Sequence, residues 1–347
     1  MEKVIAFGDI HGCYKAAQTA VKLAEDLNLR VVFLGDYVDR GPSAVKTLKV
    51  LIQAKVNHPD WVFLRGNHDQ MLLDLINQEA IITDIGEALE NIKYDYKQAA
   101  ASYEEWKALE PNERSNIFNF LNSTIYYFEN KKYIFTHAVV NMYGGLINQK
   151  PNDVLMWNYD YNPKWYGKMF VHGHSPVKYP ALRFNGINVN TECGYGGCLT
   201  GVVTDTESEL LEFYSISENG NTLNDFKMYS NQYNAEYPLL VKLSVNSDEY
   251  LEVYPLDYEN LFDWNEANTE CQKLGDGWRL PSLKEMQLIY EQLFVRDLGF
   301  FQEKQYWCSN EDSDEEGLFF AFYASGGYNS LQKNEKIKIR PVRELVQ

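Results

Sequence analysis

Five short apolar segments each run directly into a loop that carries Asp, Asn or His. The segments and loops are 4–7 before GDIHG, 31–34 before GDYVDRG, 62–64 before RGNHD, 133–135 before THA, and 169–171 before HGHS. Helical patterns over 16–27, 44–54 and 70–76 fall among the first of them. Strands that alternate with helices predict a layered α/β domain, in which reactive side chains gather at the carboxyl ends of the strands.

The polar residues of these loops are therefore expected along one rim of the domain. They are Asp9, His11, Asp36, Asn67, His68, His137 and His174. A single Gly-Asp turn or a single histidine is usually structural. The combination is stronger, because five of the chain's six histidines lie in these loops. Carboxylate, amide and imidazole groups without thiolates suit a pair of divalent ions such as Mn, Fe or Zn, and disfavour a cysteine-type structural zinc site.

Size, charge and cysteine content limit the class of protein. A chain of 347 residues has room for two domains. Its net charge of −17 argues against nonspecific binding to nucleic acid or to an anionic membrane. The N-terminus enters a strand without a secretory signal pattern, and no apolar run is long enough to span a membrane. Five cysteines without a Cys-x-x-Cys pair predict free thiols, and we expect a cytoplasmic protein.

The five motifs in this order resemble the metal-dependent phosphoprotein phosphatases, calcineurin-like metallophosphoesterases, in their bacterial branch. The resemblance covers about residues 1–215, and INVNTECGYGGCLTGVV over 187–203 is similar to a late strand segment of that branch. It implies a β-sandwich flanked by helices. It also implies two divalent metals, with Mn expected and Fe or Zn as alternatives, bridged by a carboxylate and a hydroxide that attacks phosphorus.

The resemblance assigns a role to each residue of the rim. Asp36 would bridge the metals, and the other ligands would be Asp9 and His11 at one site and Asn67, His137 and His174 at the other. His68 would be the general acid, held and charged by Asp39. Arg40 would bind the substrate phosphate, with Asn67 beside it.

Some positions depart from the family pattern or take a structural interpretation. Tyr159 and Tyr161 stand where a second phosphate-binding arginine is usual, and Lys164 is the nearby residue that could substitute for it. We interpret Arg65 as structural support and His172 as a packing histidine. Residues 77–130 form a helical insertion, either a cap that selects substrate or a helical pair that packs on the domain.

A second domain is expected after a polar, Asn-rich segment over 216–237 that is typical of a linker. We place the metallophosphatase domain at 1–235 and a smaller α+β domain at 236–347. GWRLPS, YWCSN and RPVR resemble the C-terminal domain family of bacterial collagen-like adhesins, which is C-type lectin-like. Ser282 and Glu285 predict a capping box at the start of a helix. This domain would either recruit a protein partner or buttress the catalytic domain.

Three functions follow from the motifs. The first is a serine/threonine protein phosphatase, a metal-dependent phosphomonoester hydrolase. The second is a dinucleoside polyphosphate hydrolase, because a fold does not determine its substrate. The third is a non-catalytic sensor that binds a phosphorylated ligand through its metals. The acid pair of Asp39 and His68 argues against the sensor, which would not need a proton donor.

Overall fold

The structure is a computed structural model that describes most of the chain. The described residues are 3–79, 94–138, 168–183, 186–208, 210–229, 239–243, 249–255, 257–258, 260–296, 301–323 and 325–345. Two compact units are present: Met1–Ser208 with Phe213–Asn224, and Glu209–Glu212 with Asp225–Gln347. Residue 235, the expected end of the first domain, lies outside the described residues. Among the described helices, none has the length and apolar composition that a bilayer crossing requires.

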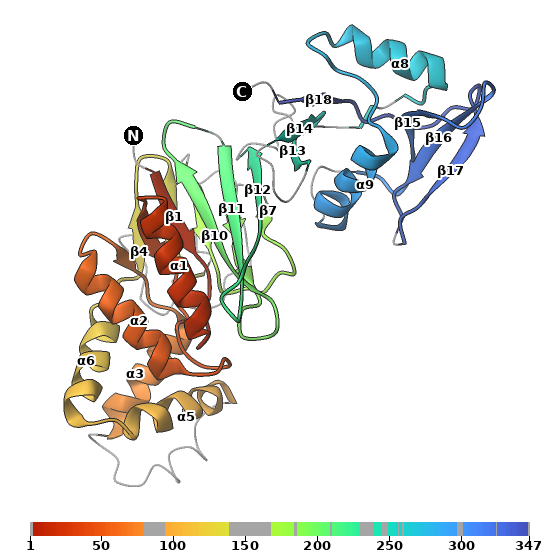
Figure 1. Cartoon of the computed structure of the whole chain (residues 1–347). Coiled ribbons are helices and arrows are strands. Elements are labelled where there is room, and N and C mark those ends of the chain that lie inside the picture. The colour runs from red at the N-terminus through yellow and green to blue at the C-terminus, as the bar shows by residue number, and fades with distance from the viewer. Residues whose placement is uncertain are drawn as a thin grey trace, which may run out of the picture. The chain divides into compact units, whose positions relative to one another are not determined.

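The first sheet carries the strands that precede the first three motifs (Figure 1). Its order is β12-β11-β10-β1-β2-β3, and β9 pairs with β10. The strands are β1 (Lys3–Phe7), β2 (Arg30–Phe33), β3 (Val62–Phe63), β9 (Asn190–Thr191), β10 (Cys198–Asp205), β11 (Leu210–Ser217) and β12 (Thr222–Tyr229). Strands β1, β2 and β3 run parallel, so their carboxyl ends meet at one edge, as the motif positions predict.

The second sheet carries the strands that precede the last two motifs. Its order is β4-β5-β6-β8-β7, and β5, β6 and β8 run parallel. The strands are β4 (Tyr127–Glu129), β5 (Tyr133–Thr136), β6 (Met169–His172), β7 (Ala181–Arg183) and β8 (Gly186–Asn188). Every residue of β5 is buried, as expected where a sheet is covered on both faces.

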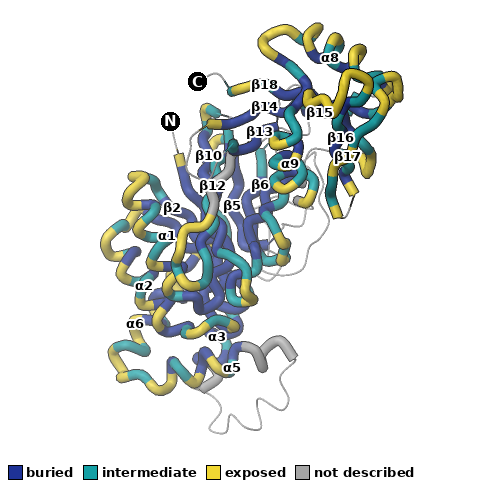
Figure 2. Tube along the Cα trace, turned by 45° about the vertical axis from the view of Figure 1, so that its right-hand side comes forward, coloured by how far each residue is buried: buried dark blue, intermediate teal, exposed yellow. Residues whose placement is uncertain are grey.

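Helices of the first unit bury one face and expose the other. They are α1 (Tyr14–Asp26), α2 (Ala44–Asn57), α3 (Asn67–Glu79), α5 (Tyr94–Lys107) and α6 (Pro111–Asn122). In α1 the buried residues are alanines at helical spacing, which lets the helix lie close to its neighbours. Figure 2 shows exposed residues recurring along α1 and α2, whereas β2 and β5 of the same unit are largely buried. Helix α3 begins at Asn67, so Asn67 and His68 lie in its first turn and not in the preceding loop.

The insertion over 77–130 packs on the core of the first unit. Tyr103 and Trp106 of α5 and Phe120 of α6 are buried in the same cluster as Phe33 of β2. Burial of side chains of this size contributes about 1.5–3 kcal/mol each. The described part of the insertion thus packs on the domain, as both a cap and a helical pair would, and residues 80–93 lie outside the described residues.

The interpretation of 216–237 as a linker is wrong for its first part. Strands β11 and β12 continue the first sheet there, joined by a turn in which Gly220 has a φ of 84°. The sequence carries an Asn-Gly pair at 219–220, which favours a hairpin. The Asn-rich composition hid this signal, because composition over a window says nothing about the residue at the turn.

The C-terminal unit is an α+β structure with two small sheets. One has the order β13-β14-β18 and the other β15-β16-β17. The elements are β13 (Leu239–Lys242), β14 (Tyr250–Val253), α8 (Trp264–Lys273), α9 (Leu283–Gln292), η2 (Phe294–Arg296), β15 (Gln305–Glu311), β16 (Glu316–Ala321), β17 (Tyr328–Gln332) and β18 (Val342–Glu344). Trp307 is fully buried. Cys271 and Cys308 are free thiols, as the cysteine pattern predicts.

The capping box predicted at the start of α9 is confirmed. The Ser282 hydroxyl accepts from the Glu285 N–H at 3.3 Å, and the Glu285 carboxylate accepts from the Ser282 N–H at 2.6 Å. Arg279 donates to both oxygens of the same carboxylate, at 2.9 and 2.7 Å. The bonds to the Ser282 and Glu285 N–H groups satisfy donors that the helix itself leaves without partners.

Ser282→Ala should weaken α9 by about 1 kcal/mol, because the side-chain acceptor for the Glu285 N–H is lost. Hydrogen exchange of the α9 amides should then become about fivefold faster. Thr269→Ala, whose hydroxyl only bonds a carbonyl within α8, serves as the control and should leave α9 unchanged. Equal exchange rates for α9 in Ser282→Ala and in the original chain would contradict the capping role.

Candidate functional site

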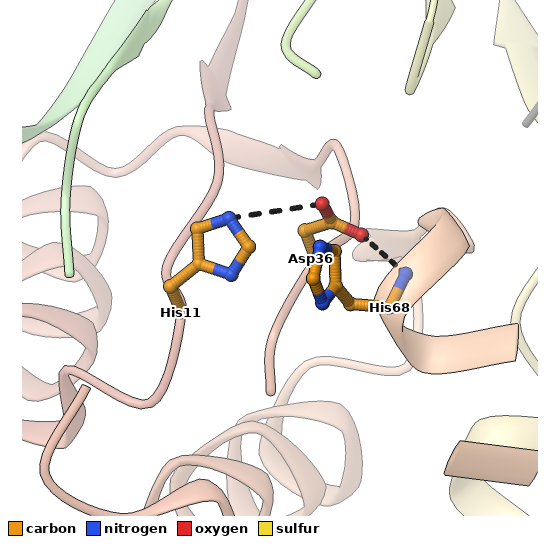
Figure 3. Close-up of side chains that lie close together, drawn as sticks. All are labelled: His11, Asp36 and His68. Carbon is orange, nitrogen blue, oxygen red and sulfur yellow. Dashed lines mark hydrogen bonds and ion pairs between the residues drawn. The ribbon is translucent and has the colours of Figure 1, made fainter. Parts of the chain in front are cut away.

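The Asp36 carboxylate lies at the centre of the residues that the motifs predicted. It follows β2 and is buried, with 2% of its surface exposed. Its Oδ2 lies 3.7 Å from His11 Nε2 and 3.4 Å from His137 Nε2. Its Oδ1 accepts a hydrogen bond from the backbone N–H of His68 at 2.9 Å. Figure 3 shows Asp36 between His11 and His68, with its two oxygens directed to different partners.

One group of donor atoms forms on the side of His11. The Nε2 of His11 lies 3.7 Å from Asp9 Oδ2 and 3.7 Å from Asp36 Oδ2. The Nδ1 of His11 lies 3.0 Å from the carbonyl oxygen of Val38. A carbonyl oxygen can only accept, so this hydrogen bond requires the ring proton on Nδ1. Burial lowers the pKa of His11 to about 3, so the ring stays neutral and Nε2 keeps its lone pair.

A second group of donor atoms forms around Asn67, His137 and His174. The amide oxygen of Asn67 lies 3.0 Å from His137 Nε2 and 3.0 Å from His174 Nδ1. The other nitrogen of His137, Nδ1, is 3.0 Å from the carbonyl oxygen of Leu34 and is thereby oriented. Asp36, His137 and His174 each offer an atom within 4.8 Å of the others. The structure thus brings all six predicted ligands together, and His68, which the resemblance does not make a ligand, also offers an atom within 4.8 Å of His11 and Asp36.

The charges of these groups call for cations. Burial and the nearby Asp36 raise the pKa of Asp9 to about 6. Burial would also raise the pKa of Asp36, but the neighbouring imidazoles, His137 first, lower it well below its usual value. Burial alone would lower the pKa of His137. The negative charge of Asp36 outweighs burial and raises this pKa to about 9. A divalent cation would take the place of that proton, and the set of oxygen and imidazole donors without thiolate fits a pair of such cations.

The site is held in backbone conformations that most residues avoid. Asp36, Asp39 and Arg40 have φ angles of 52°, 69° and 67°, in the left-handed region, and His11 and His174 have 45° and 63°. Each such residue costs on the order of 1–3 kcal/mol and persists only where its surroundings enforce it. Strain concentrated on the predicted site residues is typical of a functional centre.

Asp69 and Asn190 enforce this geometry, and sequence reasoning missed both. Asp69 accepts backbone N–H groups of Asp36, Tyr37 and Gly66, each at 2.9 Å. Burial raises the pKa of Asp69 to about 7. Asn190 donates to Asp9 Oδ2 at 2.7 Å and to the carbonyl oxygen of His174 at 3.0 Å. The available signals were weak: Asp69 only closes the RGNHD motif, and Asn190 lies in the late strand segment.

Two motif glycines let the site loops touch. A Cβ atom on Gly66 would lie 2.1 Å from Asp36 Oδ1, and a Cβ on Gly173 would lie 2.1 Å from Asp9 Oδ1. Both distances are far below contact, so any side chain there would displace a carboxylate of the site. The glycines are therefore required by close approach.

His68 and Asp39 form the predicted pair. Their Nδ1 and Oδ2 atoms are 2.6 Å apart. The Ser102 hydroxyl from α5 donates to Asp39 Oδ1 and accepts from the Asp39 N–H at 3.0 Å, so the insertion supports this pair. Burial alone would lower the pKa of His68. The negative charges of Asp36 and Asp39 raise this pKa by more, so the net shift is upward. The guanidinium of Arg40 contacts two histidines of the site. It donates to His11 Nε2 and, at 3.0 Å, to His68 Nε2.

The remaining sequence interpretations divide clearly. Arg65 is structural, as expected, because it is buried and donates to Thr124 at 2.9 Å and to the Leu121 carbonyl at 2.8 Å. His172 is buried, and burial lowers its pKa to about 4, which fits a neutral packing histidine. Residues 139–167, with Tyr159, Tyr161 and Lys164, lie outside the described residues.

Substitution of ligands should separate the two groups. Asp36→Asn should lower the occupancy of both metal positions, because Asp36 faces both groups, whereas His11→Ala should mostly lower one. Elemental analysis of proteins loaded with Mn²⁺ measures this directly. The matched control is His58→Ala, because His58 stacks on Trp61 at the surface and should leave both positions filled. A full metal content in Asp36→Asn would refute the shared role.

Comparison with known proteins places this geometry in a family. The model of the calcineurin-like phosphoesterases matches residues 2–202. Bis(5'-nucleosyl)-tetraphosphatase PrpE [asymmetrical] of a Geobacillus species is 26% identical over 233 residues, covering 57% of this chain and 89% of that protein. The protein of the same name from Oceanobacillus iheyensis is 25% identical, with coverage of 57% and 87%. A cold-active protein-tyrosine phosphatase of a Shewanella species has a TM-score of 0.44 at 15% identity, with coverage of 64% and 80%. The chain belongs to the calcineurin-like phosphoesterase family.

Proposed function

We propose that the chain hydrolyses dinucleoside tetraphosphates asymmetrically, into a nucleoside triphosphate and a nucleoside monophosphate. The observation that carries this proposal is the extent of the match to proteins named for that activity. The alignment with the Geobacillus protein covers 89% of its length, so the similarity extends well beyond a single motif.

The residues of the site suit phosphoryl transfer to water. When bound, two divalent cations would supply a water of lowered pKa and positive charge for the phosphate oxygens, and Asp9, His11, Asp36, Asn67, His137 and His174 would hold them. Arg40 has two guanidinium nitrogens that now contact imidazoles, and these N–H groups would turn to two phosphate oxygens. That movement frees His68 Nε2, while Asp39 keeps the ring oriented through Nδ1.

A second candidate is the hydrolysis of phosphoserine or phosphothreonine in proteins. The observation that favours it is the His68–Asp39 pair at 2.6 Å. The alkoxide that leaves from phosphoserine is a strong base and needs a proton in the transition state. A nucleotide that leaves from a tetraphosphate is a much weaker base and needs the proton far less. The two candidates therefore make different demands on the same residue.

For the C-terminal unit we retain partner recognition on a C-type lectin-like fold as a proposal. What supports it is the set of GWRLPS, YWCSN and RPVR segments in the sequence. The family match ends at residue 202, so the activity of the first unit is argued without the C-terminal unit.

A substrate panel distinguishes the two catalytic candidates. With Mn²⁺ present, we expect kcat/KM for diadenosine tetraphosphate to exceed that for a phosphoserine peptide by at least about tenfold, which is 1.4 kcal/mol of transition-state binding. Chromatography should show ATP and AMP in equal amounts. The reverse preference would favour the protein phosphatase, and symmetric ADP products would refute asymmetric cleavage. A protein with full metal content that turns over neither substrate would be the sensor.

Replacement of His68 by Asn tests the proton donor. On a phosphoserine peptide the variant should lose about a hundredfold or more in kcat, a typical cost for a lost general acid. On nitrophenyl phosphate and on the tetraphosphate the loss should be much smaller, because those leaving groups need less protonation. Asp39→Asn should show the same order of losses, more weakly, with both metals retained. Equal losses on all three substrates would mean that His68 acts in binding or in metal positioning.

A further inference from the structure

The loop over 192–197, between β9 and β10, lies directly on the site. Gly194 has a φ of 90°, and a Cβ atom there would stand 2.7 Å from the Cβ of His11 and 3.4 Å from the Cβ of Arg40. Glu192 and Gly196 also have positive φ angles, of 66° and 89°. Three left-handed residues within five positions make a tightly bent loop, which needs fixed partners to keep one conformation.

The loop presents Tyr195 to the guanidinium of Arg40. The Cζ atom of Arg40 lies 4.6 Å from the centroid of the Tyr195 ring, a cation–π distance. The same ring meets His11 edge-on, with centroids 6.3 Å apart and planes at 67°. Tyr195 is 59% exposed and Arg40 is also exposed, so neither is held by burial in the core. Their mutual contact limits the freedom of a long, flexible cation at the mouth of the site.

Glu218 fixes the loop from outside. One oxygen of its carboxylate, Oε1, accepts the N–H of Gly194 at 2.8 Å and the N–H of Gly196 at 2.6 Å. These two N–H groups flank Tyr195. Glu218 lies in the turn between β11 and β12, and that turn is itself tied to α1, where the Thr19 hydroxyl donates to the Gly220 carbonyl at 2.7 Å. The contacts thus run continuously from α1 through the turn and the loop to Arg40.

We propose that Glu218 and Tyr195 are positioning residues that hold the Arg40 guanidinium ready for the substrate phosphate. This inference rests on the phosphate-binding role that the proposed function gives to Arg40. A cation that the Tyr195 ring already keeps at the mouth of the site loses less conformational entropy when it turns to the phosphate, so the gain is in affinity for the phosphate group. Among the described residues, Tyr195 meets the predicted ligand His11 only by an edge-on ring contact at 6.3 Å, and Glu218 bonds only backbone N–H groups of the loop. Their loss should therefore spare metal binding.

Variants of Tyr195 test the ring. Tyr195→Ala should raise KM for nitrophenyl phosphate about threefold and weaken competitive inhibition by inorganic phosphate equally, as expected for an exposed cation–π contact. The kcat should change by less than about twofold, because the acid pair is untouched. Tyr195→Phe keeps the ring and should behave like the original chain. A loss in Tyr195→Phe as large as in Tyr195→Ala would show that the hydroxyl acts, and would overturn the role of the ring.

Variants of Glu218 test the anchor. Glu218→Ala should raise KM and the inhibition constant of inorganic phosphate in the same ratio as Tyr195→Ala, with both metals retained. Glu218→Gln should restore both values, because both hydrogen bonds end on a single oxygen that an amide carbonyl can replace. Glu207→Ala is the matched control, since Glu207 is an exposed glutamate of the same unit whose carboxylate only approaches Lys131, at 3.6 Å.

Arg40→Ala distinguishes the positioning role of Glu218 and Tyr195 from the phosphate-binding role of Arg40. If Arg40→Ala weakens phosphate inhibition while Glu218→Ala and Tyr195→Ala do not, the positioning role is wrong and the role of Arg40 stands. If Arg40→Ala leaves inhibition unchanged, the assigned role of Arg40 is wrong and the positioning role falls with it. Metal loss in Glu218→Ala would show that the anchor supports His11, which also overturns the inference. None of these assays depends on the tetraphosphate.

Discussion

The shared carboxylate of Asp36 is the constraint on which the rest of the site depends. It is almost fully buried, and its Oδ2 lies 3.7 Å from His11 Nε2 and 3.4 Å from His137 Nε2. A buried charge costs several kcal/mol unless it is paired, and here the compensation comes from N–H donors, imidazoles and the cations that the donor set fits. Asp69 locks the loop by accepting the N–H of Asp36, in a strained conformation that the chain would not adopt alone.

Segments far away in the sequence support the functional residues around this centre. Ser102 comes from the insertion and fixes Asp39, the partner of His68. Glu218 comes from the turn after β11 and holds the loop that carries Tyr195 against Arg40. The His68–Asp39 pair and Arg40 are thus each anchored by an element outside the five motifs. This arrangement lets the motifs supply the chemistry while other parts of the fold determine how rigidly it is presented.

The sequence predicted the residues whose chemistry is rare and missed those whose chemistry is common. Histidines and aspartates at strand ends are unusual enough to mark the metal groups, and the parallel strands bring them together as expected. Ser102 and Glu218 each act through two hydrogen bonds, over 63 and over 22–24 positions, and a serine or a glutamate in a polar segment carries no local sign of such a partner. The same limit hid β12, because a strand with mixed composition is defined by its neighbour more than by its own residues.

Anomalous diffraction from crystals of the full chain grown with Mn²⁺ tests the central claim most directly. Two anomalous peaks should appear, one beside Asp9 and His11 and one beside Asn67, His137 and His174, with an oxygen of Asp36 within bonding distance of both. Metal–ligand distances would then identify each ligand independently of any assay. Peaks that avoid Asp36, or a single peak bound by only one of the two groups at saturating Mn²⁺, would contradict the account of a shared carboxylate.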